Sequence, residues 1–258
     1  EQPSRVLETL EGRITDKQVL INAFGADAES IFSQTKAVQI VACGSSFYTG
    51  LVAKYWCEQI VGVPCHVEIA SEFRYRQVAV QPDTLMVTIS QSGETADTLA
   101  ALRDATDENY LASLCLCNVP NSSLVRESDL CLMINAGPEI CVASTKAFTN
   151  QLTDLLLLVL SLAKSQGMSS EKEAEYVAAL NSVPDLLSET LSRDPEIKIV
   201  AEQFVDKNHA LFLGRGTHHP VALEGALKLK EISYIHAEGY PAGELKHGPL
   251  ALVDNDMP

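Results

Sequence analysis

Short runs that are apolar at nearly every position recur along the first half of the chain, and amphipathic stretches separate several of them. A strand that is buried on both faces reads as a continuous apolar run, so this pattern predicts a parallel sheet covered by helices on both sides. The predicted fold class is α/β, a three-layer parallel sheet flanked by helices. The predicted strands are residues 38–43, 65–69, 84–90, 111–117 and 129–134, with helices at 46–61, 71–77 and 94–105.

The second half of the chain begins with helix and then returns to a strand–turn–helix pattern over residues 209–231. Proline interrupts the helical stretch because it lacks the backbone N–H that a helix interior needs, so breaks are expected at Pro184 and Pro195. The predicted helices are residues 144–167, 171–192 and 196–208.

Two pairs of residues at one spacing indicate an internal duplication. Gly44 and Gly216 are 216 − 44 = 172 residues apart, and Glu72 and Glu244 are 244 − 72 = 172 residues apart. A constant offset is typical of duplicated units. By the same shift the chain ends inside the second copy, which is therefore expected to be truncated and to continue in the natural protein. The predicted organisation is an N-terminal helical arm or linker at 1–36, a first α/β domain at 37–165, a helical connection at 166–208 and an incomplete second domain at 209–258.

Charge and composition narrow the classes of partner. The 258 residues contain 19 Lys and Arg against 34 Asp and Glu, a net charge of −15. This sign disfavours binding to nucleic-acid backbones and to anionic membranes. The longest apolar run, residues 155–163, is far shorter than the roughly 20 residues that span a membrane. No signal peptide opens the sequence, and none of the seven cysteines has zinc-site spacing, so we expect a cytoplasmic protein with reduced cysteines and no metal site.

Two hydroxyl-rich turns follow predicted strands. SQSGETADT occupies residues 90–98, and CGSSFYTG occupies residues 43–50. Both lie where a strand gives way to a helix, and helix N-termini at the carboxyl ends of parallel strands bind anions. Neither turn contains a nucleotide-binding glycine pattern, which favours a phosphate monoester. N-capping of the following helices is an equally ordinary use of these hydroxyls and stays open at this stage.

Several segments together resemble a known family. They are VACGSS, ASEFRYR, TISQSGETADT, ICVASTKAFT, LGRGTHHPVALEGALKLKEISYIHAE and GELKHGPLAL, which fall between residues 38 and 258. In combination they resemble the isomerase half of the glutamine–fructose-6-phosphate aminotransferases, the glucosamine-6-phosphate synthases, which consists of two sugar-isomerase (SIS) domains. The SQSGET motif alone indicates only a sugar-phosphate site of the SIS type.

The resemblance implies a substrate, a product and partners. Fructose 6-phosphate and ammonia from glutamine would give glucosamine 6-phosphate, for UDP-N-acetylglucosamine synthesis, without cofactor or metal. The family has a glutaminase domain upstream and a C-terminal tail with a further lysine, so this chain is expected to bind the sugar phosphate at most. A homodimer with shared active sites is also implied, in which the equivalent of His247 comes from the neighbouring subunit. The implied phosphate-binding residues are Ser46, Ser90, Gln91, Ser92 and Thr95, and the other substrate-binding residues are Cys43, Gly44, Ser45, Val142 and Ser144.

The resemblance assigns the chemistry to Lys228, Glu231 and His247, and the residue types suit it. Lys228 and Glu231 are three apart in a predicted helix, so they share a face. Converting a ketose to an aldose amine moves a proton between C1 and C2, for which Glu231 is the expected base. Lys228 would form an imine with the ketone or polarise its oxygen, and His247 would transfer the proton that opens the sugar ring.

Two alternative functions would use the same cradle, the phosphate-binding site that the two hydroxyl-rich turns are expected to form. An SIS-type amino-sugar-phosphate deaminase or deglycase would run in the breakdown direction. A non-catalytic sugar-phosphate sensor would bind without turnover, although such regulators usually carry a basic DNA-binding module that this sequence lacks.

Overall fold

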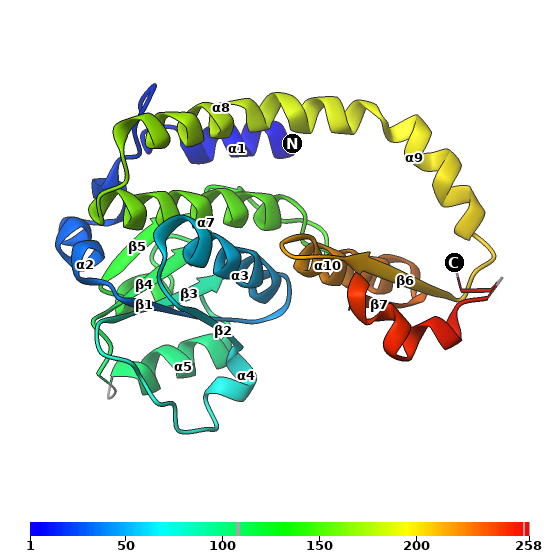
Figure 1. The fold of residues 1–258 in the computed structure, drawn as a ribbon, viewed down its shortest axis with the longest axis horizontal. Coiled ribbons are helices and arrows are strands. Elements are labelled where there is room, and N and C mark those ends of the chain that lie inside the picture. Colours follow the sequence, from blue (N-terminus) through cyan, green and yellow to red (C-terminus); the bar gives the residue numbers. More distant parts are fainter. Residues whose placement is uncertain (107–108, 255, 258) are drawn as a thin grey trace. The chain divides into compact units, whose positions relative to one another are not determined.

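The computed structural model describes residues 1–106, 109–254 and 256–257 (Figure 1). The chain forms two compact units. The first consists of Glu1–Glu139 and Thr145–Pro184. The second consists of Ile140–Ser144 and the chain from Asp185 onward.

The first unit contains a five-stranded parallel sheet in the order β2-β1-β3-β4-β5. Every residue of β1 and of β3 is buried, which explains why these strands read as continuous apolar runs. All five predicted strands and the parallel α/β fold are confirmed. The strands are β1 Ala37–Ala42, β2 Cys65–Ile69, β3 Thr84–Ser90, β4 Ala112–Cys117 and β5 Leu130–Met133.

Helices cover both faces of this sheet (Figure 1). The helices α3 (Gly44–Trp56) and α7 (Lys146–Ser165) lie on one side, and α4 (Ala70–Phe73) and α5 (Ala96–Thr106) lie on the other. A π-helical turn, Cys57–Val61, extends α3, and the short α6 (Ser123–Glu127) precedes β5. The three-layer arrangement leaves the ends of the strands as the places where a ligand can reach the sheet.

The predicted helix at 71–77 is too long. Helix α4 ends at Phe73, and the residues after it form turns. Two ion pairs hold this segment: Arg74 binds Asp97 at 2.8 Å, and Arg76 binds Glu68. Contacts with β2 and α5 therefore decide the end of α4, and its own sequence pattern does not show them.

The N-terminal elements α1 (Gln2–Leu10), η1 (Ile21–Phe24) and α2 (Ala28–Gln34) belong to the first unit. Asn150 of α7 donates a hydrogen bond to Thr9 at 2.6 Å, and Thr9 donates to the carbonyl of Ile134 at 2.8 Å. Arg13 forms a buried ion pair with Asp154 at 2.6 Å. Burial raises the pKa of Asp154, and the Arg13 guanidinium opposes that rise. Polar bonds thus fix the N-terminal segment to α7.

The second helical region differs from the sequence prediction at one proline. Helix α8 runs without interruption from Ser170 to Ser192, so the break expected at Pro184 is wrong. A proline removes one backbone hydrogen bond and strains the preceding turn, and a helix of 23 residues keeps its other bonds. The boundary expected at Pro195 is confirmed, because Pro195 lies in the first turn of α9 (Asp194–Ala201), where no N–H partner is needed.

The second unit contains a β–α–β arrangement. Strands β6 (His209–Gly214) and β7 (His236–Pro241) pair in parallel, and α10 (His218–Ser233) connects them. The short 3₁₀ turns η3 (Glu202–Phe204), η4 (Ala242–His247) and η5 (Pro249–Leu252) complete the unit. Gly44 at the first position of α3 and Gly216 just before α10 share the same φ of +57°. This likeness supports the predicted duplication, which stays a prediction.

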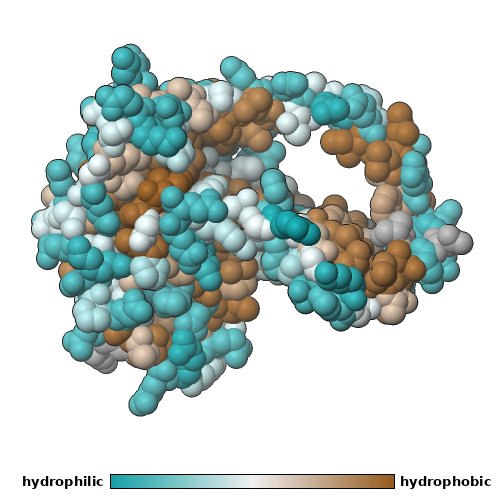
Figure 2. Space-filling model, viewed as in Figure 1, coloured by the Kyte–Doolittle hydropathy of each residue, from teal (hydrophilic) through white to brown (hydrophobic). Residues whose placement is uncertain are grey.

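The second unit contains a cavity lined by apolar side chains. Side chains of α9, η3 and β6, among them Ile197, Phe204 and Phe212, line a cavity of about 540 Å³. Figure 2 shows the apolar residues gathered on α9. Among the described helices of the chain, none combines the length and the apolar character needed to cross a membrane.

Candidate functional site

The strand order reverses between β1 and β3, whose carboxyl ends lie side by side. The chain leaves β1 into α3 on one face of the sheet and leaves β3 into α5 on the other face (Figure 1). In open parallel sheets, ligands bind at such a reversal of strand order. The register pairs Ala42 with Ile89, so Cys43 and Ser90 follow at neighbouring strand ends. The two hydroxyl-rich turns predicted from the sequence therefore lie at the same edge of the sheet.

The turn after β3 is held by its own hydroxyl groups. Ser90 is 3% exposed, and its Oγ accepts a hydrogen bond from the Gly93 N–H at 3.0 Å. The Ser90 and Thr95 hydroxyls share a bond at 3.1 Å. Ser92 Oγ accepts from the Glu94 N–H at 3.2 Å. The hydroxyls thus shape the turn in the absence of a ligand, and the partly exposed Gln91, Ser92 and Thr95 remain accessible to one.

Gly93 allows this turn to pack closely against β4 and α6. Its φ is +69°, a region that side chains rarely adopt. A Cβ at this position would lie 2.0 Å from Ser122 Oγ and 2.6 Å from Cys117 Sγ. The glycine in SQSGET is therefore required by packing as well as by backbone conformation.

Glu94 lies in the same turn, and its carboxylate is engaged elsewhere. Oε1 accepts a hydrogen bond from the Ser123 N–H at 2.7 Å. This bond to the first residue of α6 lowers the pKa of Glu94. The bond links the turn to α6.

The turn after β1 begins α3 and is fixed from α7. Cys43 is the N-cap residue, and its side chain makes no capping bond. Ser46 is 9% exposed, and its Oγ accepts a hydrogen bond from Gln151 Nε2 at 3.0 Å. Thr49 donates to the Ser46 carbonyl at 2.7 Å and to Gln151 Oε1 at 3.3 Å. Gln151 is 1% exposed, so a buried amide positions the predicted phosphate-binding serine.

Sequence reasoning missed Gln151 and Thr49. The available signal was a set of polar residues, Asn150, Gln151 and Asp154, at the start of a leucine-rich helix. All three are buried. Buried polar groups need partners, so their positions in an apolar helix could have indicated that α7 holds a polar network.

The remaining substrate-binding candidates fall into two groups. Gly44 and Ser45 form the first turn of α3, next to Cys43. Val142 is 91% exposed, and it belongs with Ser144 to the short segment of the second unit.

The candidate catalytic residues belong to the second unit. On α10, Lys228 Nζ lies 2.6 Å from Glu231 Oε2 and 3.4 Å from Glu224 Oε1. The side chains of Lys228 and Glu231 are 20% and 25% exposed, whereas that of Glu224 is 7% exposed. The helical spacing therefore brings Lys228 and Glu231 together as predicted, and it adds Glu224, whose carboxylate holds the ammonium from the preceding turn.

His247 ends η4 and is exposed. None of the contacts described within this chain joins it to Lys228 or Glu231. Its predicted role beside them, supplied by a neighbouring subunit, stays a prediction.

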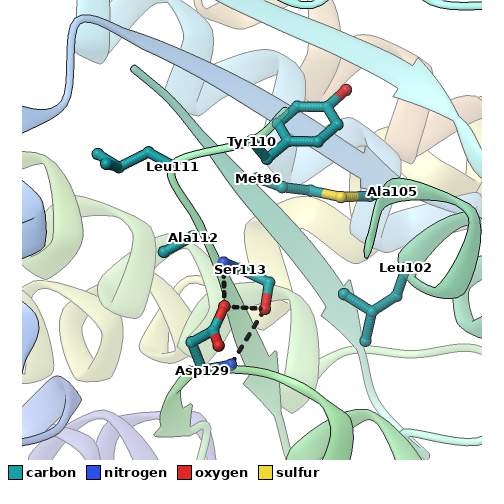
Figure 3. A pocket seen from close by; sticks show the side chains of 8 residues that line it. All are labelled: Met86, Leu102, Ala105, Tyr110, Leu111, Ala112, Ser113 and Asp129. Atoms are coloured by element: carbon teal, nitrogen blue, oxygen red, sulfur yellow. Dashed lines mark hydrogen bonds between the residues drawn. The ribbon is translucent and has the colours of Figure 1, made fainter. Parts of the chain in front are cut away.

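A separate cavity of about 240 Å³ lies at the amino ends of β3 and β4, away from the hydroxyl-rich turns (Figure 3). The Ser113 hydroxyl and N–H both donate to Asp129 Oδ2 at 2.8 Å. Asp129 returns a bond from its own N–H to Ser113 Oγ at 3.0 Å. These bonds join β4 to the start of β5, which is a structural use of the two side chains.

The parallel sheet and its strand order define an α/β protein of the flavodoxin-like kind, with two hydroxyl-rich turns at the reversal of the strand order. Comparison with known proteins gives the family. The SIS domain model matches residues 31–161 and 203–258, so the chain belongs to the SIS domain family.

Within that family the chain is similar to glutamine–fructose-6-phosphate aminotransferases (isomerizing). It is 63% identical to the protein of Pseudomonas putida and 58% identical to that of Escherichia coli K12, over all of this chain and 42% of each relative. The C-terminal domain of glucosamine–fructose-6-phosphate aminotransferase from Francisella tularensis superposes with a TM-score of 0.98 at 53% identity. That match covers all of this chain and 72% of the solved one. The resemblance expected from the motifs is confirmed.

Proposed function

We propose that this chain is the sugar-isomerising part of an enzyme that makes glucosamine 6-phosphate from fructose 6-phosphate and ammonia derived from glutamine. The chain spans less than half the length of the curated relatives, so a glutaminase domain upstream belongs to the proposal. A cytoplasmic location and a homodimer with shared active sites are proposed with it.

The observation that carries this proposal is the pair of turns at the strand-order reversal. Their hydroxyl, amide and backbone groups offer hydrogen bonds to a phosphate monoester, and the start of α3 adds the partial positive charge of a helix N-terminus. We assign the phosphate to Ser46, Ser90, Gln91, Ser92 and Thr95, and the sugar to Cys43, Gly44, Ser45, Val142 and Ser144.

The proposed chemistry rests on α10. The Glu231 carboxylate would move the proton between C1 and C2, and Lys228 would bind or polarise the C2 carbonyl. A lysine held by two carboxylates keeps its amine at a defined place on the helix face, which such a step requires. His247 is proposed for ring opening.

The chain is 58% and 63% identical in sequence to two aminotransferases. This similarity favours the aminotransferase reaction over that of a deaminase and over the function of a sensor.

Calorimetric titration of the chain with fructose 6-phosphate tests the cradle. We expect Thr95→Val to weaken binding about 10- to 100-fold, because a hydrogen bond to a charged group contributes about 1.5–3 kcal/mol. Thr190→Val on α8 makes the same chemical change at an exposed site whose hydroxyl bonds only its own helix, and it should leave binding unchanged. Fructose without phosphate should bind far more weakly. Equal affinity of both variants, or of both sugars, would contradict the assignment.

A further inference from the structure

Two histidines meet at the amino end of the two-stranded sheet in the second unit. His209 begins β6 and His236 begins β7, and the parallel register makes them direct partners. Their Nδ1 atoms are 3.2 Å apart, and their rings lie nearly perpendicular at 84°. Both side chains are exposed, so solvent and ions reach the space beside them. The two residues are 27 positions apart in the sequence, and only the strand pairing brings them together.

A carboxylate lies beside one of these rings. His236 Nε2 lies 3.4 Å from Glu238 Oε1, and the Tyr240 hydroxyl donates to the other Glu238 oxygen. The residues 236, 238 and 240 alternate along β7 and so share one face of the strand. An acceptor beside Nε2 favours the tautomer with its proton on that nitrogen, which leaves the Nδ1 lone pair facing His209. In metal sites a histidine commonly donates its second ring N–H to a carboxylate, and Glu238 lies close enough to Nε2 to accept such a bond once the ring is bound.

We propose that His209 and His236 bind a divalent transition-metal ion, with Zn²⁺ as the type case, through their two Nδ1 atoms. Two nitrogen ligands of a tetrahedral zinc ion, each about 2.0–2.1 Å from the metal, are about 3.3 Å apart. The observed separation of 3.2 Å already matches this requirement. Imidazole nitrogens suit zinc, nickel and copper, whereas magnesium and calcium prefer oxygen ligands.

The ion would join β6 to β7 and would not serve the reaction. No group of three or more His, Cys, Asp or Glu side chains with metal-site geometry occurs among the described residues, so water completes the coordination. The two histidines lie at the amino ends of the strands, whereas α10 follows the carboxyl end of β6. Binding to the folded state alone stabilises it by mass action, so the ion should raise the stability of the second unit.

Titration of the full chain with ZnCl₂, followed by calorimetry and thermal unfolding, tests the proposal. We expect a single zinc ion bound per chain and a raised Tm, with no effect of MgCl₂. His209→Gln and His236→Gln should each abolish this binding. His66→Gln changes an exposed strand histidine of the first unit and should leave it intact. Glu238→Ala should weaken zinc binding about 10- to 100-fold while keeping both ligands.

Long-range ¹H–¹⁵N spectra of the wild-type imidazoles provide a measurement that depends on no substitution. Zinc should shift the Nδ1 signals of His209 and His236 and leave those of His66 in place. Absence of zinc binding by the wild-type chain, retention of binding in both histidine variants, or unshifted Nδ1 signals would each overturn the proposal.

Discussion

Gly93 lies in the turn after β3, and its hydrogen bonds and packing show how single residues hold this turn in place. Ser90 bonds the Gly93 N–H, and the Gly93 carbonyl accepts from the Leu124 N–H at 3.2 Å. The missing side chain makes room for Ser122 and Cys117. One glycine therefore joins β3, β4 and α6 behind the proposed phosphate position.

We expect Gly93→Ala to lower the free energy of unfolding by about 2–4 kcal/mol, since it combines left-handed backbone strain with overpacking. Gly12→Ala is the matched control. Gly12 has a φ of +71°, and a Cβ there would meet nothing within 4 Å, so only the backbone cost should appear. Urea unfolding of both variants measures the difference. Equal losses of stability would show that the contact with Ser122 costs nothing.

At the scale of elements, buried polar bonds attach the N-terminal segment to the sheet. Arg13 follows α1 and pairs with Asp154 of α7, and it also donates to the Met133 carbonyl at the end of β5. Both side chains of the pair are almost fully buried. The sequence shows Asp154 only as an acidic residue within a leucine-rich helix, because its partner lies 141 residues away.

Removing the cation should therefore cost more than neutralising the acid. We expect Arg13→Leu to destabilise the chain by about 3–5 kcal/mol, because it leaves a buried carboxylate without its partner. Asp154→Asn should cost less, since the amide oxygen still accepts from Arg13. Chemical unfolding followed by circular dichroism compares the two variants, and a smaller loss for Arg13→Leu than for Asp154→Asn would contradict this reading of the pair.

At the scale of the whole molecule, the chain contains two compact units, with the hydroxyl-rich turns in the first and the Lys228–Glu231 pair in the second. The relatives extend well beyond the part that this chain matches. The apolar cavity of α9 and β6 belongs to the second unit. Turnover is therefore a property to be measured on the longer protein.

Glu231→Gln in that longer protein separates an enzyme from a sensor. We expect glucosamine 6-phosphate formation to fall about 10²- to 10⁴-fold, the usual contribution of a positioned base, while glutamine hydrolysis continues. Glu189→Gln on the exposed face of α8 is the matched control and should keep full activity. Assays with glutamine and separately with ammonia give both rates. Unchanged synthesis in Glu231→Gln would exclude the proposed role of this carboxylate.

The fold class could be predicted because the central strands β1 and β3 are buried on both faces, so each of them is a nearly continuous apolar run in the sequence. The two turns could be predicted as a candidate cradle because strand-to-helix turns in parallel sheets share one edge. The Lys228–Glu231 contact followed from helical spacing alone. These are local patterns, and local patterns survive in a single sequence.

Tertiary structure alone decided the contacts between distant segments. The Gln151–Ser46 bond, the Arg13–Asp154 pair and the facing rings of His209 and His236 join residues from different elements. The end of α4 was decided in the same way, by ion pairs with α5 and β2. Such contacts depend on strand register and helix packing. A single sequence does not determine these, because many residues far along the chain are equally suitable as partners for a given polar side chain.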